Sequence, residues 1–252
     1  MGAGLTTALL VTTLAGLATA LGALLGVLLR RPGPRAMSAS LGFAAGVMVY
    51  VSFAELLKNA FASGIGFAGG NLAFFAGFGA MFVVDLAVPH EYMAESHDRG
   101  RRGRLMRTGV LTALGLGIHN FPEGLATFTA TLHDVKLGMA VGFAIAVHNI
   151  PEGLAVSAPI LAATGRRGKA FAWGALSGLA EPAGALVAAA VLHAYLTETA
   201  LGWLMGGVAG LMVYVALDEL VPASRQYGHE HLAITAAGGG MGIMALSLWM
   251  LH

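Results

Sequence analysis

Long apolar runs, separated by short polar segments, follow one another along almost the whole chain. A helix that spans a bilayer needs about 20 mostly apolar residues. Eight runs meet this requirement, with predicted limits of 5–29, 37–58, 66–89, 108–132, 137–163, 169–195, 200–222 and 232–251. The pattern predicts an all-α integral membrane protein with eight transmembrane helices. We expect residues 1–252 to form a single transmembrane domain, in which residues 90–107 are the only sizeable loop.

The basic residues predict how these helices are oriented. Every Lys and Arg except Lys58 and Lys136 falls in or beside the odd-numbered loops. Cytoplasmic loops collect Lys and Arg, so we expect both termini outside and the loop 90–107 in the cytoplasm. The first apolar run has no basic residue before it, which favours a retained helix over a cleaved signal peptide.

The composition supports this interpretation and excludes several classes of function. Hydrophobic residues make up 57% of the chain and charged residues 11%, whereas soluble domains have about 25% charged residues. The mean hydropathy is +0.75. The 37 glycines suit helices that pack closely in lipid. The absence of cysteine excludes disulfides and thiolate chemistry, and a net charge of +1 gives no reason to expect a nucleic-acid partner.

Two internal repeats stand out. Residues 119–126 read His-Asn-Phe-Pro-Glu-Gly-Leu-Ala, and residues 148–155 repeat this motif with only the third position changed. Residues 46–56 and 210–220 share a Gly-x-Met-Val-Tyr-Val frame and a Glu-Leu ending. In each pair the two copies lie on spans predicted to run in opposite directions, so both pairs are predicted to be inverted repeats, as in many secondary transporters. Chance resemblance between apolar helices is the alternative for the second pair.

The repeated motif places ionisable side chains at mid-membrane, where they usually face a cavity, a partner or an ion. His119 and Glu123 lie one helical turn apart on one face, as do His148 and Glu152. Two such faces offer two imidazoles and two carboxylates, which suit Zn²⁺ and also Fe²⁺ or Mn²⁺. The alternative is a polar contact between helices with no metal.

A third deep carboxylate extends the predicted site. Glu181 lies near the middle of the sixth span and is followed by Pro182. Together with Asn120, Asn149 and a bridging Glu123 or Glu152, it would form a second metal position beside the first. Pro122 and Pro151 each free a backbone carbonyl next to the motif histidines.

Other polar residues carry weaker expectations. Glu55 and Glu219 are equivalent in the second repeat, and they either attract cations at the two mouths of the protein or are solvated acids at helix ends. Asp85 is expected to be structural. Weak metal binding or plain solvated loop is expected for His90, Glu91, Glu95, His97, His133, Asp134, His193, His229, Glu230 and His231.

The paired motifs resemble the fourth and fifth helices of the ZIP (Zrt/Irt-like) divalent-metal transporters, especially the bacterial ZupT-type and GufA-type branch. Residues 178–184 and 218–222 resemble that family's sixth-helix and seventh-helix motifs. The resemblance implies eight spans with both ends outside. It also implies transport of Zn²⁺, and of Fe²⁺, Mn²⁺, Co²⁺ or Cd²⁺, toward the cytoplasm. The chain departs from the family in the second span, where Lys58 follows Glu55 and a proline would be expected nearby.

The resemblance also implies a paired-metal site. Its first position would be formed by His119, Glu123, His148 and Glu152. Its second position would be formed by Asn120, Asn149 and Glu181, with Glu123 and Glu152 shared.

We therefore expect a divalent-metal transporter that works by alternating access, not an enzyme, and without a catalytic cofactor. The expected partners are divalent metal ions and the lipid bilayer, and a homodimer is left open. The expected location is the plasma membrane of a bacterium or archaeon, with several passes. The alternatives are a metal-selective channel and an intramembrane metalloenzyme, although the chain lacks a His-Glu-x-x-His motif.

Overall fold

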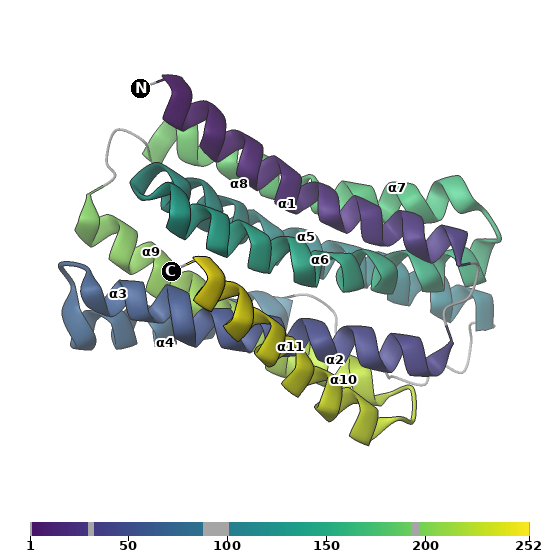
Figure 1. Cartoon of the computed structure of the whole chain (residues 1–252). Helices are drawn as coiled ribbons and strands as arrows, with labels where there is room; N and C mark the ends of the chain where they lie inside the picture. The colour runs from purple at the N-terminus through teal and green to yellow at the C-terminus, as the bar shows by residue number, and fades with distance from the viewer. Residues whose placement is uncertain (1, 30–32, 88–100, 193–196, 252) are drawn as a thin grey trace.

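A computed structural model describes residues 2–29, 33–87, 101–192 and 197–251. All regular secondary structure in these ranges is helical, in agreement with the predicted all-α class. The long helices run side by side in one elongated bundle (Figure 1). The elements, with η for π-helix, are α1 (Gly2–Leu28), α2 (Pro34–Val51), η1 (Ser52–Leu57), α3 (Lys58–Ala62), α4 (Gly66–Ala87), α5 (Arg101–His133), α6 (Val135–Thr164), α7 (Arg167–Gly178), α8 (Ala180–Val187), η2 (Ala188–Leu192), α9 (Glu198–Val215), η4 (Ala216–Leu220), α10 (Val221–Arg225) and α11 (Glu230–Leu251).

Several of these elements follow one another without a loop and form one long helical segment, which we call a rod. Seven rods in the described part of the chain are long and apolar enough to cross a membrane: 4–28, 34–62, 66–86, 135–164, 167–191, 198–225 and 230–250. Each matches a predicted span within a few residues. The predicted fourth span lies within α5, which is not among the seven and whose apolar character is interrupted by strongly polar side chains, including buried His119, Asn120 and Glu123.

The helix that contains the predicted fourth span begins before that span does. Residues 101–107 were assigned to the loop, but α5 already begins at Arg101. Arginine is a good helix former, so a basic segment can extend a helix beyond its apolar part. The predicted turn after this helix is confirmed, because only Asp134 separates α5 from α6. Its side chain caps α6 by accepting a 2.8 Å hydrogen bond from the backbone N–H of Leu137.

The second pair of repeats shares an irregular feature. The π-helix η1 begins at Ser52 and the π-helix η4 begins at Ala216, and these two residues are equivalent in the repeat. Glu55 and Glu219 therefore lie at the same place in matching π-helical turns. Single π-turns inside α-helices occur often at functional sites. A shared irregularity at an equivalent position favours a true repeat over chance resemblance.

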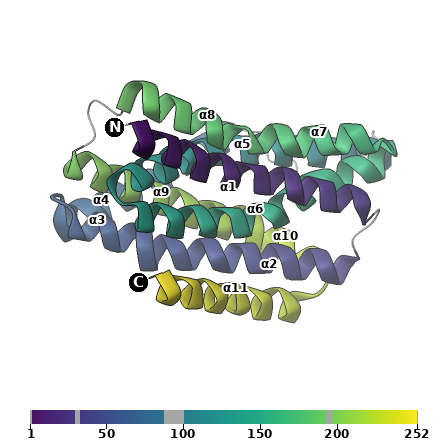
Figure 2. The ribbon, with the colours of Figure 1, turned by 45° about the horizontal axis from the view of Figure 1, so that its top comes forward.

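The helices form two groups that lie one above the other (Figures 1 and 2). We call α1, α5, α6, α7, α8 and η2 the site group, and α2, η1, α3, α4, α9, η4, α10 and α11 the frame group. Within the site group, a Cβ added to Gly22 would overlap the carbonyl of Ile150. Within the frame group, a Cβ added to Gly46 would overlap the carbonyl of Ala237.

We call such close backbone contacts at glycines glycine seams. They lie within each group and do not join the two groups. Every described glycine whose added Cβ would overlap another helix does so inside its own group. The groups meet where α2 packs on α6, where α5 packs on α9 and, over a smaller contact, where α11 packs on α6. This contact is made by buried apolar side chains such as Met48, Ile145 and Met212. Contacts of this kind are non-directional, unlike the close backbone packing inside each group.

Candidate metal site

The two copies of the His-Asn-x-Pro-Glu-Gly motif lie side by side near the middle of the antiparallel helices α5 and α6. His119, Glu123, His148 and Glu152 are all fully buried. His119 Nε2 lies 3.4 Å from Glu152 Oε1, and His148 Nε2 lies 3.4 Å from Glu123 Oε2. Each histidine therefore contacts the glutamate of the other motif. This crosswise pairing is what two copies related by a local two-fold axis would produce.

The third carboxylate joins this cluster through the amide of Asn149. Glu181 is fully buried and lies in the first turn of α8, just beyond the break at Leu179 between α7 and α8. Asn149 Nδ2 donates to Glu181 Oε1 and also to the backbone oxygen of Ala15, at 3.0 Å for the latter. The amide thereby ties α6 to both α8 and α1.

The other motif amide has a different neighbour. Asn120 Nδ2 donates to the backbone oxygen of Ser177 at 3.2 Å, which links α5 to α7. Gly124 and Gly184 allow α5 and α8 to approach closely, because a Cβ on either would overlap a backbone carbonyl of the other helix. The glycines of the motif therefore bring Glu181 toward the two histidines and two glutamates.

Several polar atoms in the cluster are buried without a hydrogen-bond partner. They are Nδ1 of both histidines, Oε1 of Glu123, Oε2 of Glu152, Oε2 of Glu181, and Oδ1 of Asn120 and Asn149. A buried polar atom without a partner costs about 1–3 kcal/mol. These atoms belong to residues from all three sequence motifs. The buried atoms without a hydrogen-bond partner therefore lie around one place in the bundle.

The side chains are paired with one another instead of being directed at a single point. Among the described residues, no three His, Cys, Asp or Glu side chains stand in an arrangement ready to hold an ion. The structure therefore brings the predicted ligands together but leaves the two His–Glu pairs closed.

Two partners of the motif amides were not anticipated from the sequence. Ala15 and Ser177 contribute backbone carbonyls, to which Asn149 and Asn120 donate. A backbone acceptor carries no side-chain signature. The only sequence signal is the spacing of small residues around Gly174 and Gly178, which permits the close approach of α1 and α7.

The remaining polar residues fall into different environments. Glu55 is only 2% exposed, so the alternative that it is a solvated helix-end acid is wrong. Glu219 is half-buried in η4. Asp85 is buried and accepts a 2.8 Å hydrogen bond from the Tyr214 hydroxyl, which links α4 to α9. His231 is exposed, and His229 is half-buried. The expectations for His90, Glu91, Glu95, His97 and His193 lie outside the described residues.

The fold and the buried cluster together define a class of protein: a polytopic helical membrane protein with a His/Asn/Glu centre inside its bundle. The sequence profile of the ZIP zinc transporter family matches residues 89–248. Three similar relatives are zinc transporters ZupT of Corynebacterium efficiens (49% identical across 94% of each chain), Chlorobium chlorochromatii (46% across 94% of each) and Streptococcus mutans (44% across 98% of each).

The chain therefore belongs to the ZIP family, as the paired motifs predicted. Its matches are to transporters and not to enzymes, so the metalloenzyme alternative is not supported.

Proposed function

We propose that this chain transports zinc toward the cytoplasm and that the ion passes through the buried centre formed by α5, α6 and α8. The observation that carries this proposal is the set of buried, unpartnered imidazole, carboxylate and amide atoms around the twin motif. The relatives named as zinc transporters support it. Borderline N and O ligands would also accept Fe²⁺, Mn²⁺, Co²⁺ or Cd²⁺. The metal is cargo, and we expect no catalytic cofactor.

The proposed first position uses His119, Glu123, His148 and Glu152. An ion entering here would replace the two 3.4 Å His–Glu contacts by metal contacts. The proposed second position uses Asn120, Asn149 and Glu181, and shares Glu123 and Glu152 with the first. Both positions would require the side chains to turn away from their present partners, because the ligands do not converge on one point in the structure.

The proposed topology has eight spans, with α5 as the fourth, and both termini outside. Burial of its polar face against α1, α6 and α8 would let α5 cross the membrane despite its low hydropathy. Residues 1–252 would form one transmembrane domain in the plasma membrane. Exposed apolar side chains such as Phe75 and Trp249 suit lipid, and they would equally suit a second copy of the chain.

We further propose alternating access, in which the site group moves against the frame group. All seven proposed ligands belong to the site group, so the ion would travel with it. The non-directional apolar contact between the groups would permit sliding, whereas the glycine seams would keep each group rigid. A channel is not favoured, because its sites must release ions quickly, whereas this centre offers many ligands to one ion.

The test is uptake of radioactive zinc into proteoliposomes that contain the full chain. We expect saturable uptake by the wild type and uptake at background for the double variant Glu123→Ala/Glu152→Ala, because the centre would lose both shared carboxylates. The matched control is Glu198→Ala/Glu230→Ala, which removes two exposed acids far from the centre and should keep wild-type uptake. Elution in gel filtration would confirm that all three proteins are folded. Equal uptake by all three would overturn the proposal.

A further inference from the structure

A second polar site lies away from the buried centre. A cavity of about 370 Å³ lies beside the turn between α5 and α6, at the end of the bundle that the proposed topology places outside. We call it the vestibule. Its polar lining comes from Glu55 and Asn59 of the frame group and from His133, Asp134 and Lys136 of the site group.

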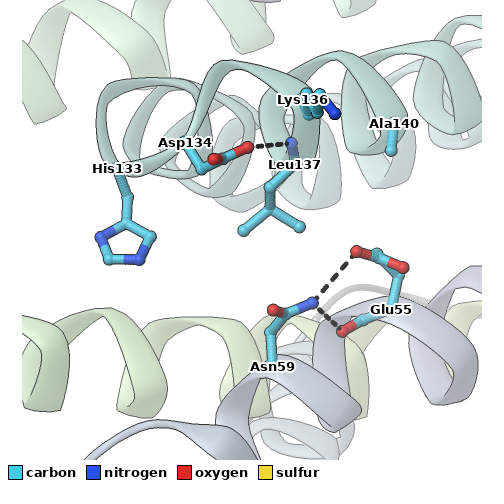
Figure 3. Close-up of a pocket in the computed structure, with 7 residues that line it drawn as sticks. All are labelled: Glu55, Asn59, His133, Asp134, Lys136, Leu137 and Ala140. Atoms are coloured by element: carbon cyan, nitrogen blue, oxygen red, sulfur yellow. Dashed lines mark hydrogen bonds between the residues drawn. The ribbon is translucent and has the colours of Figure 1, made fainter. Parts of the chain in front are cut away.

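The frame-group wall holds a buried carboxylate in a fixed position. Glu55 is 2% exposed and lies in the π-helix η1, well before the end of its rod at Ala62. Asn59 Nδ2 donates to the Glu55 backbone oxygen at 2.8 Å and to its Oε1 at 3.1 Å. Figure 3 shows these two side chains on one side of the cavity, facing the α5–α6 turn. Glu55 thus presents a carboxyl group to the cavity.

The site-group wall carries groups of mixed character. Asp134 uses one oxygen to cap α6, and His133 extends from the α5–α6 turn toward the side of the cavity on which Asn59 lies (Figure 3). By residue type, the lining holds two acids, Glu55 and Asp134, against one base, Lys136.

We propose that the vestibule captures a hydrated divalent cation before that ion reaches the buried centre. This inference rests on the proposed function, which supplies the need for such an ion to enter. No three His, Cys, Asp or Glu side chains in the described ranges converge on an ion, so the vestibule would hold the ion through its water shell. An ion with six waters fills roughly 200 Å³ at about 30 Å³ per water, which the cavity can accommodate.

One face of α6 leads from the vestibule toward the buried centre. Ala140 lines it, and Ala144 and His148 follow at successive turns on the same face of α6. At 1.5 Å per residue, the path from Ala140 to His148 is about 12 Å long. Ala140 and Ala144 are small and lie in the contact between the two groups. The lining comes from both groups, so a sliding motion would reshape the vestibule as the centre opens.

The test of water-mediated capture uses hexaamminecobalt(III), an exchange-inert cation that resembles a hydrated metal ion and cannot shed its ligands. It is placed on both sides of proteoliposomes that contain the full chain, so that orientation does not matter. We expect it to inhibit zinc uptake competitively. We expect the inhibition to be lost in the double variant Glu55→Gln/Asp134→Asn, in which Asn keeps the cap of α6.

Single variants test the charge of the vestibule. At low salt, Glu55→Gln and Asp134→Asn should each raise the KM for zinc about threefold to tenfold with little change in maximal rate, because each removes one charge near a divalent ion. Lys136→Gln should lower the KM. Glu198→Gln is the matched control, since it removes an exposed acid on the same proposed face, and its KM should equal that of the wild type. High salt should bring the KM values of all four variants close to that of the wild type.

The outcomes separate this inference from the proposed function. Wild-type uptake could depend on Glu123 and Glu152 and yet not be inhibited by hexaamminecobalt(III). This result would overturn the proposed capture of ions by the vestibule and leave the proposed role of the buried centre intact. The same conclusion follows if inhibition persists in the double variant, or if Glu55→Gln and Asp134→Asn lower the maximal rate with an unchanged KM. Absence of saturable uptake by the wild type would instead overturn the proposed function.

Discussion

Two asparagine side chains hold the buried centre in place. Asn149 and Asn120 each carry an amide into an apolar interior, where an unpaired polar group is unfavourable. Both donate to backbone carbonyls of neighbouring helices, and Asn149 also donates to Glu181. The same residues would offer their carbonyl oxygens to a metal. An asparagine can do both, because its amide has separate donor and acceptor ends.

This arrangement predicts a structural role for Asn149 that does not depend on metal. In a metal-free preparation, Asn149→Ala should lower the free energy of unfolding by about 1–2 kcal/mol, because Glu181 and the Ala15 carbonyl lose their donor. The corresponding fall in melting temperature is about 2–8 °C for a chain of this size. Thermal unfolding in detergent would measure it.

Asn71→Ala is the matched control for this variant. Asn71 is half-buried and donates to the Phe67 carbonyl of its own helix, so it ties no second helix to its own, and its loss should change stability by less than the loss of Asn149. An equal effect of the two substitutions would show that the bonds of Asn149 do not contribute to stability.

At the residue scale, the sequence predicted the members of the cluster but not how they pair. The repeated motif identified His119 and Glu152 because such side chains are rare in lipid. The crosswise contacts could not be predicted, since they depend on the relative height of α5 and α6. The burial of Glu55 was also hidden, because η1 and α3 carry its rod past the predicted end at residue 58 to Ala62.

At the scale of elements, close helix pairs depend on glycine. In the frame group, α2 and α11 approach so closely that a Cβ on Gly46 would overlap the Ala237 carbonyl. Gly239, on α11 itself, has no such neighbour. The same substitution, glycine to alanine, should therefore change the free energy of unfolding in opposite directions at these two positions.

Gly46→Ala should destabilise the protein by about 1–3 kcal/mol, because the new methyl group must push the two backbones apart. Gly239→Ala should instead stabilise α11 by up to about 1 kcal/mol, since alanine is the better helix former. Thermal unfolding of both variants in the same detergent would compare them. Destabilisation by both substitutions, to a similar extent, would contradict the idea that the α2–α11 seam is the sensitive feature.

The limits of a helix could be predicted where hydropathy alone determines them. They could not be predicted where helix propensity or a local change of helix geometry determines them. The spans that became α1, α4, α6 and α11 match their predicted limits closely. The early start of α5 was missed because Arg-rich segments look like loop in a hydropathy pattern but form helix readily. The break between α7 and α8 and the π-helices η1, η2 and η4 leave hydropathy unchanged, so apolar periodicity does not predict them.

At the scale of the whole molecule, the division into two groups gives a physical basis for alternating access. The seven proposed ligands lie in one group, the glycine seams stay within groups, and apolar side chains form the contact between them. A transporter of this design would move its cargo by shifting one rigid body past another. The sequence indicated inverted repeats, but the division into groups depends on which helices pack together and became visible only in the structure.

This division predicts which cross-links stop transport. Because the chain contains no cysteine, introduced pairs can be linked without background reaction. Asn59→Cys/His133→Cys places one thiol on each group across the vestibule, and a bis-maleimide with a cleavable disulfide should reduce zinc uptake to near background. Cleavage of the linker should restore uptake. Gly64→Cys/Thr199→Cys is the matched control, because a Cβ at Gly64 lies 3.0 Å from Thr199 Oγ1 within the frame group.

Obstruction of the vestibule by the reagent is distinguished from arrested motion by single-cysteine variants. Asn59→Cys and His133→Cys, each modified by a monofunctional maleimide of similar bulk, should retain most of their uptake if the linked pair acts by holding the groups together. Full cross-linking of Asn59→Cys/His133→Cys with undiminished uptake would exclude relative motion of the two groups at this end of the bundle. Arrest by the Gly64→Cys/Thr199→Cys link would place the moving boundary inside the frame group instead, between α3 and α9.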